Sequence, residues 1–75
     1  MQPSDLPALI NALRGEGLPE PDVEMIREEL EASSGEAPAT RLQRVRDKLL
    51  SKGGDVIGGV SVSVLTAFVK GYLGI

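Results

Sequence analysis

The chain has no cysteine, histidine or tryptophan among its 75 residues, and only one tyrosine and one phenylalanine. Without cysteine it can form neither disulfides nor thiolate metal sites. Without histidine it lacks a common zinc ligand and the side chain whose unperturbed pKa lies nearest neutrality. Because the usual pairs of nucleophile and base need one of these residues, we expect no enzymatic activity, no bound metal and no cofactor.

A chain of 75 residues makes one small domain. A domain of this size buries only about 60% of the surface that its unfolded chain exposes, so its stability is marginal and oligomerisation would add to it. The first five residues, Met1 to Asp5, carry neither a basic stretch nor an apolar stretch, so they do not resemble a secretory signal. We therefore expect a cytoplasmic protein.

The net charge of −3 hides two halves of opposite sign. Residues 1–36 hold nine acidic and two basic side chains, a net −7, and residues 37–75 hold two acidic and six basic side chains, a net +4. Halves of opposite sign favour folding back on each other or stacking head to tail between copies. Both arrangements leave less positive charge for phosphates, and we expect no nucleic-acid partner.

Apolar spacing and capping residues predict three helices before residue 53. The first covers residues 5–14 with Ser4 as its cap, and residues 21–52 form a charged pair of helices separated by a loop at 33–38. The second helix starts near residue 21 or 22, and the third runs from residue 39 or 40 to residue 51. Their predicted core residues are Leu6, Leu9, Ile10, Leu13, Val23, Ile26, Leu30, Leu42, Val45 and Leu49.

The third helix carries a basic stripe, whose members are Arg41, Arg44, Lys48 and Lys52. Such a stripe can contact phosphates, or it can face the acidic side chains of the second helix. The net acidity and the few aromatic residues for base stacking favour the second interpretation. The second helix also carries Glu28, Glu29 and Glu31, but no loop presents oxygen ligands at the spacing of a calcium site, so these carboxylates are interpreted as a solvated face.

The segment 53–75 is apolar and contains only two charges, Asp55 and Lys70. As a helix it would carry small residues every four positions along one flank, which lets a second backbone approach closely. It would also be apolar on nearly all sides, so it has to be surrounded. The chain is too short to surround it, and we expect contact with copies of itself or with another protein. The predicted interface comprises Ile57, Gly59, Val60, Ser63, Val64, Ala67, Phe68, Gly71 and Tyr72.

Two alternatives stay open for this segment. Residues 60–64 alternate valine with serine, which is typical of a strand, although the length of the whole segment favours a helix. From Val56 to Val69 there are fourteen uncharged residues, fewer than the roughly 20 that span a bilayer. A stable transmembrane helix is therefore not the first expectation. A membrane is still an alternative partner if the helix is sheltered within the protein in one state and released into the bilayer in another.

Residues 21–75 resemble the carboxy-terminal helical domain of AbiTii-like bacterial abortive-infection proteins. The matching residues are Asp55-Val56-Ile57-Gly58-Gly59, Leu65-Thr66 and Tyr72-Leu73-Gly74. The resemblance implies a small helical interaction module in a prokaryotic anti-phage defence setting, without catalytic residues.

The whole sequence predicts a single all-α domain, residues 1–75, built as a small bundle of three or four helices. We expect a non-enzymatic oligomerisation or adaptor module. The alternatives are a small membrane-active protein whose carboxy-terminal helix inserts conditionally into a bilayer and, after that, a regulator associated with nucleic acid.

Overall fold

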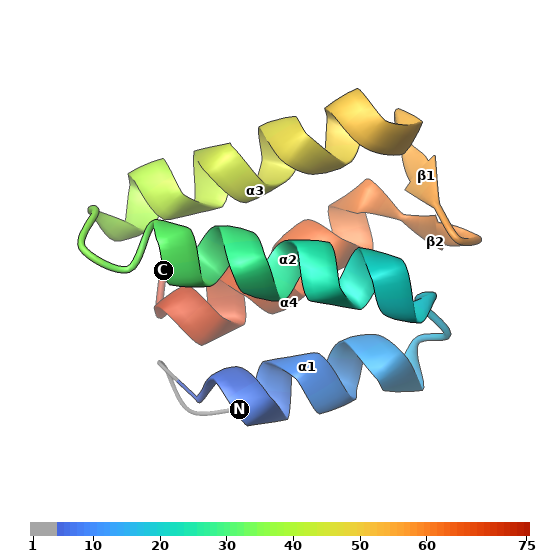
Figure 1. The fold of residues 1–75 in the computed structure, drawn as a ribbon, viewed down its shortest axis with the longest axis horizontal. Coiled ribbons are helices and arrows are strands. Elements are labelled where there is room, and N and C mark those ends of the chain that lie inside the picture. Colours follow the sequence, from blue (N-terminus) through green and yellow to red (C-terminus); the bar gives the residue numbers. More distant parts are fainter. Residues whose placement is uncertain (1–4) are drawn as a thin grey trace.

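Four helices and one short hairpin make up the computed structural model, which describes residues 5–75 (Figure 1). The helices are α1 (Leu6–Gly15), α2 (Glu20–Ala32), α3 (Pro38–Gly53) and α4 (Val62–Leu73), and the strands are β1 (Val56–Ile57) and β2 (Val60–Ser61). Both α1 and α3 pack against α2 and also against α4, and Figure 1 shows α2 lying in front of α4. The predicted all-α bundle is confirmed.

The first three helices begin and end within two residues of their predicted bounds. Asp5 caps α1, because its side chain accepts a hydrogen bond from the Ala8 amide at 3.2 Å. Ser4, the predicted cap, lies outside the described residues. Proline occupies the first turn of α2 at Pro21 and of α3 at Pro38, where its missing amide proton costs no hydrogen bond.

The core receives side chains from every helix. Fully buried residues include Leu13 of α1, Leu30 of α2, Leu49 of α3, and Leu65 and Val69 of α4. The prediction that three short helices cannot cover the apolar carboxy-terminal segment is therefore wrong for its inner face. The helix α4 is one-sided: its buried residues lie three or four positions apart, and its other side is exposed.

The predicted single helix over residues 53–75 is also wrong. Gly53 is the last residue of α3, and a β-hairpin separates it from α4, with Val56 opposite Ser61 and Ile57 opposite Val60. The turn between the strands is Gly58-Gly59, with φ of +60° and +83°. Two successive positive φ values suit a two-residue hairpin turn and end helical geometry.

Residues 60–64, for which both a strand and a helix were open, contain the end of a strand and the start of a helix. Val60 and Ser61 form β2, and α4 begins at Val62. Ser61 caps that helix, because its side-chain oxygen accepts a hydrogen bond from the Ser63 amide at 3.1 Å.

Ion pairs join the two halves of opposite charge. Lys52 Nζ lies 2.5 Å from Asp22 Oδ1, and Arg44 Nε lies 2.8 Å from Glu36 Oε2. Arg41 Nη2 donates to the Leu30 carbonyl oxygen at 2.8 Å. Arg44 and Lys52 thus pair with acids of α2 or of the loop after it, and Arg41 bonds to a backbone carbonyl of α2. None of the three pairs with Glu24, Glu28 or Glu31, so the basic stripe contacts α2 but not the row of glutamates that it was predicted to face.

We predict that Gly58→Ala lowers the free energy of unfolding by about 2 kcal/mol or more. A side chain at φ +60° is strained, and an added Cβ would lie 2.2 Å from Cδ of Pro19 in the linker between α1 and α2. Urea unfolding followed by circular dichroism measures the loss. Gly15→Ala is the matched control, because no atom lies within 4 Å of its added Cβ. Equal stability of Gly58→Ala and the parent would contradict the packing of the hairpin tip on Pro19.

We predict a lowered pKa for Glu20. Arg14 donates two hydrogen bonds to its carboxylate, from Nε at 3.1 Å and from Nη2 at 2.5 Å, and this hydrogen bonding holds the pKa below its ordinary value of 4.5. A lowered carboxyl pKa stabilises the fold at neutral pH, and that contribution disappears as the pH falls through the folded-state pKa. An NMR titration of the Glu20 side chain measures the shift. Arg14→Gln should return the pKa toward 4.5, and an unchanged titration would exclude the pairing in solution.

Candidate protein-interaction site

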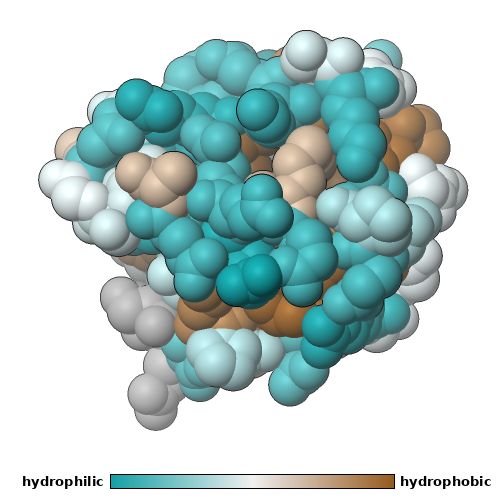
Figure 2. All heavy atoms as spheres, viewed as in Figure 1, coloured by the Kyte–Doolittle hydropathy of each residue, from teal (hydrophilic) through white to brown (hydrophobic). Residues whose placement is uncertain are grey.

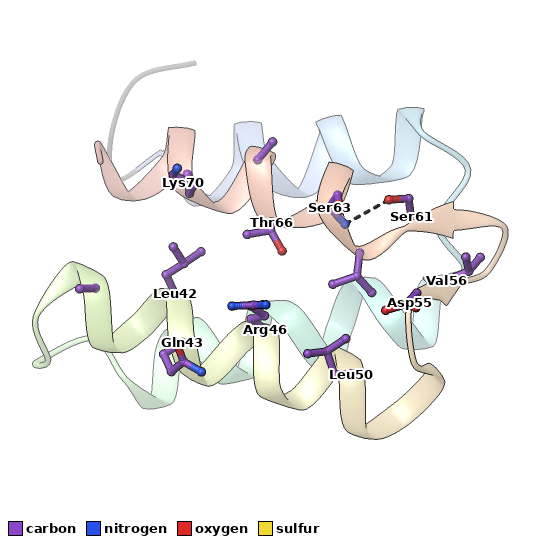
Figure 3. Close-up of a pocket in the computed structure, with 13 residues that line it drawn as sticks. Leu42, Gln43, Arg46, Leu50, Asp55, Val56, Ser61, Ser63, Thr66 and Lys70 are labelled. Carbon is purple, nitrogen blue, oxygen red and sulfur yellow. Dashed lines mark hydrogen bonds between the residues drawn. The ribbon is translucent and has the colours of Figure 1, made fainter.

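An open groove runs between α3 and α4 (Figure 3). Its volume is about 710 Å³, and the hairpin borders one of its ends. In Figure 3 the other two helices lie behind it, so the groove occupies the face of the molecule away from α2. The residues that line it are Ala39, Leu42, Gln43, Arg46, Leu50, Asp55, Val56, Ser61, Val62, Ser63, Thr66, Ala67 and Lys70.

Helical spacing places side chains along both walls of the groove. The α3 wall carries Leu42, Arg46 and Leu50, each four residues apart, and the α4 wall carries Val62, Thr66 and Lys70 at the same spacing. Residues four apart lie above one another on a helix. Two parallel rows therefore face each other across the groove, as Figure 3 shows for Arg46 and Thr66.

The groove exposes apolar side chains next to small ones. Leu50 is 36% exposed and Val56 is 55% exposed. On the opposite wall lie Ser63, Thr66 and Ala67, whose short side chains allow another helix to approach closely. This combination of apolar groups and shallow walls is typical of a surface that receives an amphipathic helix.

The charges around the groove are left free by the fold. Arg46 on one wall and Lys70 on the other form no ion pair with any residue from 5 to 75, and neither does Asp55 at the hairpin end. Beside the groove, Gln43 donates a hydrogen bond to Asp47 at 2.8 Å. In a chain of net charge −3, the groove is thus a local region with more positive than negative side chains.

The nine predicted interface residues do not form one surface. Ile57 and Tyr72 are buried in the core of the chain, and Val60 and Phe68 are half-buried against it. Gly59 lies in the hairpin turn rather than on the helix. The remaining residues are exposed on α4, and they are Ser63, Val64, Ala67 and Gly71.

Ser63 and Ala67 are the members of the predicted interface that line the groove. Of the small residues predicted every four positions along the helix, Gly59, Ser63, Ala67 and Gly71, only the last three lie on α4. The loss of Gly59 from this row follows from the hairpin, because a glycine outside the helix no longer shares the helical spacing.

The α3 wall was missed as a site. Leu42 is predicted to belong to the core, and Arg46 has no predicted role. The four-residue spacing of Leu42, Arg46 and Leu50 is visible in the sequence. It indicates the wall of a groove only when α4 is known to lie beside α3.

The tyrosine contributes to the fold rather than to this groove. The guanidinium carbon of Arg41 lies 5.6 Å from the centroid of the Tyr72 ring, which is within the range of a cation–π contact. Arg41 also donates to the Leu30 carbonyl oxygen, so it links α3 to both α2 and α4.

Other kinds of site find little support in the described part of the chain. Within residues 5–75, no group of three or more acidic side chains is placed to hold a metal ion. None of the helices in that range is long and apolar enough to cross a bilayer, and α4 has 12 residues against the roughly 20 that a span needs.

Comparisons with protein-family models, curated proteins and solved structures gave no significant match. The resemblance to AbiTii-like proteins therefore stays a prediction.

We predict that the exposed side chain of Val56 in the groove contributes little to stability. Val56→Thr should change the free energy of unfolding by less than about 0.5 kcal/mol, because the side chain is already exposed. Val69→Thr is the matched control at a fully buried position of α4, and it should cost about 1–3 kcal/mol. Chemical denaturation of both variants measures the difference. A large loss in Val56→Thr would mean that Val56 serves the fold and not an external contact.

Proposed function

We propose that this protein is a non-enzymatic oligomerisation or adaptor module whose binding surface is the groove between α3 and α4. The observation that carries the proposal is the exposure of Leu50 and Val56 beside the short side chains of α4. Exposed apolar groups in a shallow groove, bordered by charges without partners in the described chain, are typical of a protein–protein contact.

Self-association suits the size of the chain. Its accessible surface is 4052 Å², and a stable interface of standard size buries about 800 Å² on each partner. The contact would have to extend beyond the groove over the outer sides of α3 and α4. Burying such a share of a small protein offsets the marginal stability of a domain this size.

The anti-phage defence setting rests on the resemblance to AbiTii-like proteins alone. The membrane-active alternative has less support than the adaptor function. Insertion of α4 into a bilayer would remove Leu65 and Val69 from the core, where both are fully buried, so it requires the bundle to open.

We predict that Ala67→Leu weakens self-association at tens of micromolar and leaves the helix content nearly unchanged. Alanine and leucine have similar helix propensities, whereas a larger side chain on the groove wall obstructs a close contact, at a cost of about 1–3 kcal/mol for each copy of the interface. Size exclusion coupled to light scattering measures the mass, and circular dichroism measures the helix content.

Ala37→Leu is the control, because Ala37 is exposed and lies before α3, outside the groove. A parent chain that stays monomeric would refute self-association. Equal assembly of Ala67→Leu and the parent would exclude the groove as the interface. Binding of the parent to lipid vesicles, strengthened by Ala67→Leu, would favour the membrane alternative.

A further inference from the structure

A second surface of the protein carries charge opposite to that of the groove. Building on the proposed self-association, we propose that copies of this chain stack head to tail, with the outer face of α2 of one copy occupying the α3–α4 groove of the next.

The outer face of α2 is acidic. Glu24, Glu28 and Glu31 lie three or four residues apart, so they share one side of the helix. Arg27 pairs with Glu24 and, at 3.2 Å, with Glu31, while exposed Glu28 has no ion-pair partner among residues 5–75. One arginine among three carboxylates leaves this face with a net negative charge. Figure 2 shows a mostly hydrophilic surface over α2.

Basic side chains of α3 and α4 differ in whether they have an acidic partner. Arg44 and Lys52 pair with acids within the chain, on the side of α3 that faces α2. Arg46 and Lys70 stand on the two walls of the groove and have no acidic partner in the described chain. A helix seated between the walls can therefore offer carboxylates to cations on both of its sides.

The two surfaces lie on opposite sides of the molecule. In Figure 1 α2 is in front of α4, and in Figure 3 the groove is in front with α2 behind it. A contact between different surfaces is heterologous, so each added copy still presents one free groove and one free face. The assembly then grows as a chain or closes as a ring.

The lengths and side chains of the elements fit this contact. The 13 residues of α2 make a helix about 20 Å long, close to the about 18 Å of the 12-residue α4 that forms one wall. The short side chains Ser63, Thr66 and Ala67 leave room for it. A two-fold contact between two grooves would instead bring together two surfaces that each carry two cations and one carboxylate, and this excess of like charge disfavours that arrangement.

Two charge-reversed variants test the contact. The groove variant carries Arg46→Glu and Lys70→Glu, and the face variant carries Glu28→Lys and Glu31→Lys. Each should associate at least tenfold more weakly than the parent, because each has lost one half of the contact. An equimolar mixture should assemble again, because the intact acidic face of the first variant fits the intact groove of the second.

Single reversals outside both surfaces serve as controls. Lys48→Glu changes a cation of α3 that does not line the groove, and Glu16→Lys changes an exposed acid that lies outside α2. Both controls should assemble like the parent. Thermal unfolding followed by circular dichroism identifies any variant that fails to fold, and added salt should weaken the parent assembly, since exposed ion pairs are screened.

Light scattering coupled to size exclusion gives the mass in every case. Association of the mixture with neither variant associating alone supports head-to-tail stacking. A face variant that assembles as tightly as the parent overturns it, while loss of assembly in the groove variant would then still support the proposed function. A parent that remains monomeric overturns both.

Discussion

The glycine turn at residues 58 and 59 sets the geometry on which the rest of the structure depends. Both residues have positive φ, which non-glycine residues adopt at a cost, and the turn divides the apolar carboxy-terminal segment into a hairpin and the helix α4. Without that division, one long helix would continue past the bundle with apolar sides that nothing covers. With it, α4 packs against α1 and α3, and Ile57 of the hairpin enters the core. The close approach of Gly58 to Pro19 also ties the turn to the first half of the chain.

The same packing decides which charges are available to a partner. Once α3 lies beside α2, Lys52 reaches Asp22 and Arg44 reaches Glu29 and Glu36. The opposite charges of the two halves are thus partly neutralised inside one molecule. The outer face of α2 keeps an excess of carboxylates, and the groove on the opposite side keeps the cations Arg46 and Lys70 with the single carboxylate of Asp55. This separation by face, rather than by position along the chain, supports the proposed stacking of copies.

The groove also explains why two of the exposed apolar residues lie close together. Leu50 and Val56 are exposed although most large apolar side chains of this chain are buried. Isolated exposed apolar residues are common in proteins, but these two lie in one depression, across from short side chains on α4. An apolar depression with unpaired charges at its edges supports the proposed adaptor function. The depression supports membrane insertion less well, because insertion would take α4 out of the core.

The sequence by itself determined the helical class, the bounds of the first three helices within two residues, and the contact of the basic stripe with α2. These features follow from local signals: the spacing of apolar residues, proline in the first turns, and charges on one side of a helix. Only the tertiary structure decided where the apolar segment divides, that Ile57 and Tyr72 belong to the core, and that Leu42, Arg46 and Leu50 face α4 across a groove. The division depends on a glycine turn that packs against a distant proline, and the groove needs two helices that meet only after folding. Such contacts between distant residues leave no periodic pattern within either segment.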